Sequence, residues 1–280
     1  MPSGRPMIAF STGSLYTYGT LRVARLAAAA GYDGLEIMVD DRWDTRDAAY
    51  LSEVARTAGI PILSLHAPFR PLQDGWPGDE VERVTRTVEL ARALDARTVV
   101  VHPPLRYRWV SLRRPPFLNI SALTPFRRQT RYHRWLRTEL DGVGARAGVT
   151  IAIENMPRHR LAFRTVNLFD LNEIRELRHL PALTLDTTHV GTWGVDLLDT
   201  YALLADRVAH VHLSNYNGRQ HRLPHDGSLP LGAFLEALRR RGFAGVIAVE
   251  LEPDSSGAGD DGQVRERLAQ TLAFCREHFG

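Results

Sequence analysis

The sequence predicts an α/β fold, a single (β/α)8 barrel with a parallel eight-stranded core. Three observations predict it. The chain has 280 residues, enough for one such barrel. Eight short apolar runs rich in β-branched residues recur along it, and amphipathic stretches of about 10–20 residues separate those runs. We therefore expect residues 1–280 to form one barrel domain.

The predicted strands are residues 7–11, 34–39, 62–67, 98–102, 150–155, 182–186, 208–213 and 246–251. Near-continuous apolar strands that alternate with helices are typical of a parallel sheet, and eight repeats favour closure into a barrel. An open doubly wound sheet is the alternative. That fold normally carries GxGxxG after its first strand, whereas residues 11–19 read STGSLYTYG.

Between the predicted strands, apolar residues recur at helical spacing. The clearest examples are residues 21–31, 79–94 and 231–242. Glycines such as Gly31 and Gly148 stand where these helices should end, a position in which glycine readily adopts the left-handed conformation.

Two connections that follow strands are long, residues 103–124 after the fourth strand and residues 214–229 after the seventh. The first contains four prolines. Both are expected to be βα loops, on the face where barrel active sites form.

Composition excludes several classes of protein. No apolar run approaches the roughly 18 residues of a membrane span, and the start of the chain lacks the apolar core of a secretory signal. The single cysteine, Cys275, cannot form an internal disulfide, which fits a reducing compartment. We expect a cytoplasmic protein with no membrane partner.

All 35 basic residues are arginine. Without lysine, the chain cannot form a Schiff base, so lysine aldolase and pyridoxal phosphate mechanisms are excluded. The lysine of a phosphate-binding P-loop is also missing. We expect no nucleotide cofactor.

Arginine is concentrated in residues 103–138, a segment without acidic residues. Outside it the formal charge is −6, because only 26 basic residues remain against 32 acidic ones. The cluster fits either a surface for a polyanion or the solvated face of a helix. The arginines are Arg106, Arg108, Arg113, Arg114, Arg127, Arg128, Arg131, Arg134 and Arg137.

Four consecutive predicted strands, the fifth to the eighth, each deliver a residue that can bind a metal. These residues are Glu154, Asp186, His212 and Glu250. Any one of them could be a salt-bridge partner or a helix cap. Together at a barrel mouth, three carboxylates and an imidazole would satisfy one divalent cation, and this mixed ligation suits Mn, Mg, Co or Zn.

Further candidates lie at similar positions. The additional metal ligands would be His66, His102, His189 and His221. His210 precedes His212 by two residues, so we expect it one layer deeper in the barrel, in a structural role. Glu36 either supports a metal ligand or forms a structural salt bridge.

Several segments resemble the xylose isomerase-like TIM-barrel superfamily, which includes sugar and sugar phosphate isomerases and epimerases and also endonuclease IV-type apurinic endonucleases. They are GYDGLEIMV (31–39), LSLHAPF (63–69), VVHP (100–103), IAIENM (151–156), LDTTH (185–189), VHLSN (211–215) and IAVELEP (247–253). The resemblance covers nearly the whole chain and is more specific for the superfamily than for a substrate.

The isomerase and epimerase branch implies one divalent ion at Glu154, Asp186, His212 and Glu250. The ion would act as a Lewis acid that stabilises an enediolate. Glu154 and Glu250 would be catalytic and move a proton on the two faces of the substrate carbon. A sugar hydroxyl would bind His189, and Arg219 would hold a hydroxyl or a phosphate. Apolar walls would come from Tyr107, Trp109 and Trp193.

The endonuclease branch implies a zinc-dependent phosphoester hydrolase, with nucleic acid as a partner. One zinc would bind His66, His102 and Glu154, and the next would bind Glu154, Asp186, His212 and Glu250. His189 and His221 match two ligands of a third zinc. The aspartate that this branch places two residues before His221 is Arg219 here. The motif GYDGLEI instead resembles the sugar branch. Histidines at positions 66 and 102 are not typical of ketose epimerases.

The leading prediction is a divalent-metal isomerase or epimerase of a small sugar or sugar phosphate, with the hydrolase as the alternative. A third class, a non-catalytic sensor of metal or ligand, fits less well with so many candidate ligands.

Overall fold

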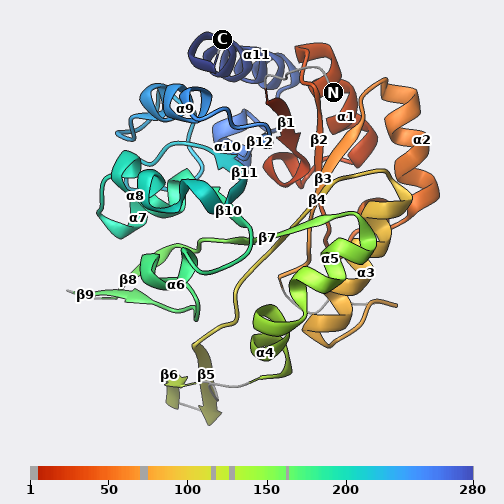
Figure 1. The fold of residues 1–280 in the computed structure, drawn as a ribbon. Coiled ribbons are helices and arrows are strands. Elements are labelled where there is room, and N and C mark those ends of the chain that lie inside the picture. The colour runs from red at the N-terminus through yellow and green to blue at the C-terminus, as the bar shows by residue number, and fades with distance from the viewer. Residues whose placement is uncertain (1–5, 70–74, 115–117, 126–129, 162–163, 280) are drawn as a thin grey trace.

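Figure 1 shows the fold in a computed structural model. The structure describes residues 6–69, 75–114, 118–125, 130–161 and 164–279. The description of side chains leaves out residues 107–114, 118–125 and 161.

Eight parallel strands close into a barrel, as the sequence predicts. Around the barrel, in order of pairing, they are β1 (Met7–Ser11), β12 (Val246–Val249), β11 (Val208–Leu213), β10 (Leu183–Asp186), β7 (Thr150–Glu154), β4 (Thr98–Val101), β3 (Ile62–His66) and β2 (Gly34–Met38). The first and last strands complete the ring, with Phe10 opposite Val249.

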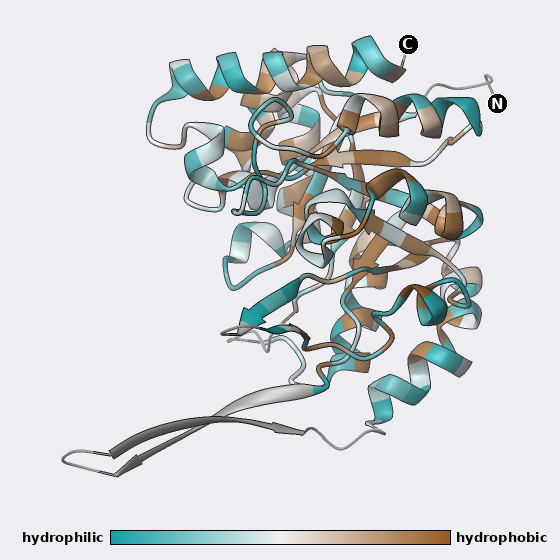
Figure 2. Ribbon diagram, turned by 90° about the vertical axis from the view of Figure 1, so that its left-hand side faces the viewer, coloured by the Kyte–Doolittle hydropathy of each residue, from teal (hydrophilic) through white to brown (hydrophobic). Residues whose placement is uncertain are grey.

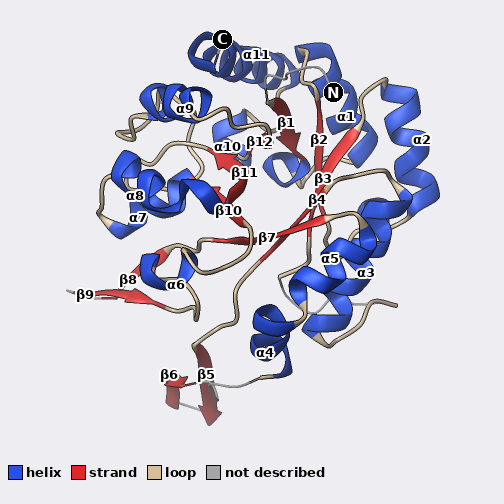
Figure 3. Cartoon of the chain, in the orientation of Figure 1, coloured by secondary structure: helices blue, strands red, loops and turns tan. Residues whose placement is uncertain are grey.

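Helices cover the outside of the barrel (Figure 3). They are α1 (Thr20–Ala30), α2 (Ala48–Ala58), α3 (Glu80–Ala93), α4 (Arg131–Thr138), α5 (Leu140–Ala147), α6 (Ile174–Leu177), α7 (Thr187–Trp193), α8 (Leu197–Leu204), α9 (Leu231–Arg240), α10 (Pro253–Ser256) and α11 (Asp261–Phe279). Among the described residues, 3-10 turns occupy Thr12–Leu15, Trp43–Thr45 and Ala205–Arg207. Gly31 ends α1 at φ +90°, and its N–H bonds to the carbonyls of Ala27 and Ala28, a conformation that favours glycine.

Alternation along the strands separates an apolar outer layer from a polar interior. Leu35 and Ile37 on β2 are fully buried in the apolar core. Glu36 between them is also fully buried, and it contacts His210 and His212 on β11 and Ser64 on β3. Such alternation is the rule in barrels. Figure 2 shows the hydrophobic strands in the middle of the molecule and hydrophilic segments on the outer helices.

In the part of the chain that the structure describes, two antiparallel hairpins extend the barrel connections. The predicted loop 103–124 contains one, formed by β5 (Tyr107–Arg114) and β6 (Leu118–Pro125). A second, formed by β8 (Arg158–Leu161) and β9 (Arg164–Asn167), follows β7 and was not predicted. The predicted loop 214–229 is an irregular connection with an isolated bridge between Asn215 and Arg222.

Helix α11 runs alongside α1 and brings the end of the chain back to its beginning (Figure 1). The Tyr32 hydroxyl donates to the carbonyl oxygen of Leu268 at 3.2 Å. Within the described ranges, no helix has both the length and the apolar character needed to cross a membrane. The single domain over residues 1–280 stays a prediction.

Candidate metal centre

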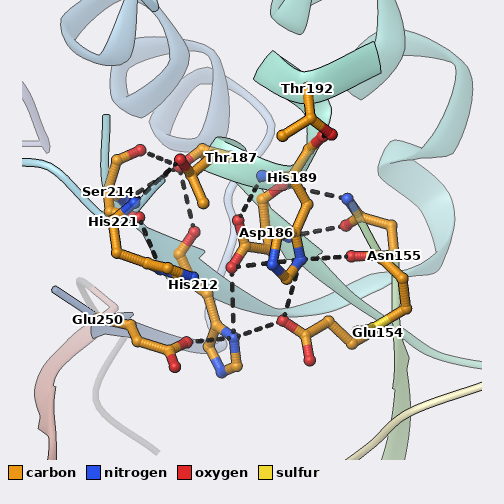
Figure 4. A network of polar contacts seen from close by, with 12 residues as sticks. Glu154, Asn155, Asp186, Thr187, His189, Thr192, His212, Ser214, His221 and Glu250 are labelled. Atoms are coloured by element: carbon orange, nitrogen blue, oxygen red, sulfur yellow. Dashed lines mark hydrogen bonds and ion pairs between the residues drawn. The ribbon is translucent and has the colours of Figure 1, made fainter. Parts of the chain in front are cut away.

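The carboxyl ends of four barrel strands bring the predicted ligands together (Figure 4). Glu154 ends β7, Asp186 ends β10, His212 lies on β11 and Glu250 directly follows β12. One ligand atom from each lies within 4.8 Å of the others. The strand directions explain this, because the carboxyl ends of parallel strands meet at one mouth of the barrel.

His212 is the centre of the group and is fully buried. Its Nδ1 lies 2.9 Å from Glu154 Oε1, 3.0 Å from Glu250 Oε2 and 3.8 Å from Asp186 Oδ2. Its Nε2 points the opposite way, 3.1 Å from Glu36 Oε1. The imidazole therefore presents one nitrogen to the mouth, while the other lies against a buried carboxylate.

Asp186 supplies the test of whether these residues fit a cation. Its Oδ1 accepts a hydrogen bond from the backbone N–H of His189 at 2.8 Å, which caps α7. Its Oδ2 is buried and has no hydrogen-bond partner among the described residues. Burial raises the pKa of Asp186 to about 7. Because a buried carboxylate oxygen without a hydrogen bond is costly, a divalent cation between Asp186 and its neighbours fits the donors present.

The electrostatics of the mouth depend on His212. Burial would raise the pKa of Glu250, but the imidazole outweighs it and holds that pKa at about 2. The pKa of Glu154 is also held well below its usual range, against burial, by His212 first. Conversely, burial would lower the pKa of His212, but Glu36, Glu250 and Glu154 hold it well above its ordinary value. The carboxylates around His212 therefore favour a positive charge at the mouth, which a bound cation would also supply.

A second group of ligands shares Glu154. His66 Nε2 lies 3.3 Å and His102 Nε2 3.0 Å from the same atom, Glu154 Oε2. His66 Nδ1 lies 2.9 Å from the carbonyl oxygen of Ala67, which fixes the ring with Nε2 toward the carboxylate. Phe69 stacks on His102 with centroids 5.2 Å apart. Glu154 therefore faces His212 with one oxygen and this histidine pair with the other.

A third group combines Asp186 with His189 and His221. His189 Nδ1 lies 2.8 Å from the carbonyl oxygen of Asn155. The ring centroids of His189 and His221 are 5.5 Å apart. His189 and His221 both line the cavity described below. All four additional candidate histidines are therefore at the mouth.

Beneath the mouth, Glu36 connects the ligands to the barrel interior. Its Oε2 lies 2.9 Å from His210 Nε2 and accepts a hydrogen bond from Ser64 Oγ at 2.9 Å. Against burial, His212 and His210 hold the pKa of Glu36 well below its usual range. His210 is fully buried one layer deeper than His212. Glu36 thus contacts a candidate ligand directly.

A cavity of about 610 Å³ opens over the ligands. Besides His66, His102, Glu154, His189, His221 and Glu250, it is lined by Gly13, Tyr16, Met38, Asp40, Asp41, Arg42, Phe69, Met156, Pro157, Leu251 and Glu252. The residues from the loops after β1, β2 and β3 were not predicted as site residues. Only Phe69 carried a signal, because it directly follows His66-Ala67-Pro68 in the quoted LSLHAPF segment.

Two of the predicted substrate residues, Arg219 and Trp193, are placed less favourably than His189, which lines the cavity. Arg219 has a 68% exposed side chain and pairs with Asp254 at 2.8 Å. Trp193 is buried, and its Nε1 donates to the carbonyl oxygen of Met156 at 2.9 Å. Neither lines the cavity. Tyr107 and Trp109 lie outside the residues whose side chains are described. These substrate contacts stay predictions.

The arginine-rich segment matches its helix-face interpretation where side chains are described. On α4, Arg131, Arg134 and Arg137 are exposed, whereas Trp135 and Leu136 are buried. Arg106 pairs with Asp170 at 2.9 Å. The side chains of Arg108, Arg113, Arg114, Arg127 and Arg128 lie outside the description.

Comparison with known proteins follows the fold and the site. Residues 24–278 match the family described as xylose isomerase-like TIM barrel. An uncharacterized protein of Mycobacterium tuberculosis is 27% identical over 97% of this chain and 97% of its own length.

Three solved structures share the fold. A 3-keto-D-glucoside 4-epimerase from E. coli has a TM-score of 0.66 and 19% identity, covering 96% of this chain and 99% of that one. A D-allulose 3-epimerase from Methylomonas sp., solved with D-allulose, has a TM-score of 0.66 and 17% identity, covering 98% and 97%. An AP endonuclease of family 2 from Brucella melitensis has a TM-score of 0.66 and 17% identity, covering 96% and 98%. At such identities the likeness extends to the fold alone.

Proposed function

Because the chain belongs to the xylose isomerase-like TIM-barrel family, we propose that it is an isomerase or epimerase of a sugar or sugar phosphate and depends on a divalent metal. The sugar epimerases among the solved structures with this fold support the choice of substrate class.

The observation that carries the proposal is the placement of two carboxylates. Glu154 and Glu250 come from strands separated by β10 and β11, and each reaches His212 Nδ1, at 2.9 and 3.0 Å. A sugar carbon between them would present one face to each. One carboxylate would take the proton from that carbon as a general base, and the other would return a proton to the opposite face. Return to the same carbon inverts it, whereas return to its neighbour isomerises the sugar.

Glu154, Asp186, His212 and Glu250 would hold the cation. When bound, it would supply Lewis-acid polarisation of the substrate oxygens and offset the negative charge that develops on them. His189 would orient a substrate hydroxyl, since Asn155 holds its Nδ1 and leaves Nε2 for the cavity. Glu36, which lies beneath the mouth against His210 and Ser64, would keep the His212 ring in its orientation.

Proton exchange with solvent tests this proposal. Candidate sugars and sugar phosphates are incubated with the metal-loaded protein in D2O, and deuterium is followed by NMR at the carbon next to the carbonyl. We expect deuterium to enter there during turnover, and Glu250→Gln to abolish both signals while the circular dichroism spectrum is unchanged. Turnover without deuterium entry, or full activity of Glu250→Gln, would overturn the proton-transfer role.

A zinc-dependent phosphoester hydrolase is the second candidate, and one observation favours it. His66 and His102 both direct Nε2 at Glu154 Oε2, so a second cation could bind beside the first. Two metals can activate water and clamp a phosphodiester. The solved AP endonuclease with this fold also supports it.

Metal content separates the two candidates. One Mn, Co or Mg per chain, measured by elemental mass spectrometry on protein purified without chelator, supports the isomerase. Two or more zinc ions per chain, with cleavage of an abasic DNA duplex, would favour the hydrolase instead. The absence of bound metal, with none taken up on titration, contradicts both.

A further inference from the structure

A second cavity, of about 430 Å³, adjoins the first. The two cavities share the lining residues Phe69, His102, Met156 and Pro157. The second cavity extends from His102 toward the start of α3, where Glu80, Arg83 and Val84 line it. The cavities therefore adjoin at these four residues, and a molecule bound in both would have to pass beside the stacked rings of Phe69 and His102.

Arg83 is the unusual residue of this second cavity. It lies on α3 and is only 4% exposed. Its Nη1 donates to the carbonyl oxygen of Gly78. Its Nε is buried without a hydrogen-bond partner, and within the described ranges neither Nε nor Nη2 has an acceptor. Nε and Nη2 form one edge of the guanidinium, the edge that grips carboxylate or phosphate with two parallel hydrogen bonds.

The charge of Arg83 is not neutralised by an ion pair in the described part of the chain. Glu80 is the one acidic residue among the described lining residues, and it forms no ion pair with Arg83. The charge of Arg83 acts on it at longer range, since burial raises the pKa of Glu80 and Arg83 only partly offsets that rise. Arginine stays protonated in proteins, and a buried charge without a partner is costly. An anion that entered the cavity would supply the missing acceptor and the missing charge.

We propose that Arg83 binds an anionic oxygen group of the substrate, a phosphate or a carboxylate, while the residues around Glu154 act on the other end of the same molecule. The inference rests on the proposed function, because it selects anionic sugars from the wider class of sugars. His102 lies between the two ends, since it lines both cavities and its Nε2 lies 3.0 Å from Glu154 Oε2.

Inorganic phosphate is the first probe. Its binding is measured by isothermal titration calorimetry on the protein with its metal bound, for wild type, Arg83→Met and Arg92→Met. Arg92 is an exposed arginine on the same helix and provides the matched control. We expect Arg83→Met to weaken phosphate binding by about tenfold or more, as loss of charged hydrogen bonds implies, and Arg92→Met to change it less than about twofold. Equal binding by wild type and Arg83→Met would overturn the proposal, because phosphate would then sit elsewhere, such as at the metal.

Tungstate provides a measurement that needs no variant, in case Arg83→Met does not fold. Crystals of the wild-type protein are soaked in this tetrahedral dianion, and its anomalous signal is located. We expect a peak at the Nε–Nη2 edge of Arg83. Peaks only at the metal ligands or on the outer surface would refute the inference.

Two further comparisons identify the source of the anion and keep the inference separate from the proposed function. If acetate displaces phosphate at similar concentrations, the group is a carboxylate; if it does not, the group is a phosphate. If Arg83→Met loses phosphate binding and neither wild type nor any variant turns over a sugar, the anion site is supported and the isomerase function is refuted. If the wild-type protein turns over neutral sugars but binds no phosphate, the isomerase function is supported and the anion site is refuted.

Discussion

Replacing Glu36 by glutamine tests whether this buried carboxylate orients His212, the candidate metal ligand beside it. The substitution keeps the volume of the side chain but removes its charge. Glu36 accepts a hydrogen bond from Ser64 Oγ at its Oε2, 2.9 Å away, and two imidazole nitrogens lie against the same carboxylate: His210 Nε2 2.9 Å from Oε2 and His212 Nε2 3.1 Å from Oε1. The amide of glutamine has one oxygen and one NH2 group in place of two equivalent oxygens, so it removes the negative charge from the two imidazoles and cannot offer an oxygen to all three groups.

The magnitude follows from burial, because all these side chains are fully buried and solvent does not screen them. Hydrogen bonds to a charged group contribute about 1.5–3 kcal/mol each, so we expect a loss of about 3 kcal/mol in the free energy of unfolding. For a chain of this size that lowers the Tm by roughly 6–12 °C. Loss of the carboxylate behind a ligating histidine should weaken metal binding by about 10- to 100-fold.

Competition with a chelating dye measures the metal affinity, and calorimetry measures the Tm. Ser64→Ala is the matched control, because it removes one hydrogen bond from Glu36 and leaves the contact with His212. The control should cost about 1.5–3 kcal/mol of stability, as loss of one hydrogen bond to a charged group implies, and change metal affinity by less than about threefold. A folded Glu36→Gln variant that bound metal as well as the control would refute the reasoning.

Three other predictions concern the histidine pair, the core and the cysteine. His66→Ala combined with His102→Ala should leave one metal per chain and lower isomerase activity by less than about tenfold, since one-metal chemistry does not need them; a loss of activity beyond 10³-fold would favour the hydrolase. Phe234 is fully buried and meets Tyr201 edge to face at 5.2 Å, so Phe234→Ala should cost about 3–5 kcal/mol in urea unfolding; a change below about 1 kcal/mol would contradict the packing. Burial raises the pKa of the Cys275 thiol to about 12, so an aromatic disulfide reagent should react with it only after unfolding, and rapid labelling of the native protein would show the thiol to be accessible.

The barrel was predictable because the residue types in its strands identify them as strands. Runs such as residues 7–11 and 98–102 are short, mostly apolar and alternate with helical patterns, which favours buried parallel strands. The hairpins β5–β6 and β8–β9 have no such signal. Arginines interrupt Tyr107–Arg114 and Arg158–Leu161, so hydrophobic periodicity alone gave no reason to expect strands there.

The ligand groups were predictable because strand direction determines where a strand ends. Once Glu154 and Asp186 stand at the ends of neighbouring parallel strands, they must share a mouth. Loop conformation was not predictable in the same way. The connection after β11 bonds back on itself between Asn215 and Arg222, and Arg219 extends outward to Asp254. The cavity at Arg83 depends on tertiary packing between α3 and the chain after β4, which no local pattern reveals.

Glu154 faces His212 with Oε1 and the pair His66 and His102 with Oε2. Because one carboxylate contacts both the His212 side and the His66–His102 side of the mouth, the binding free energies of ligands on the two sides are linked. Whatever binds at one oxygen changes the free energy of binding at the other, and the effect is the same size in both directions. Occupancy of this centre is therefore one joint equilibrium, and a substitution at position 154 alters both halves together, whereas a substitution at His102 or Asp186 acts first on its own side.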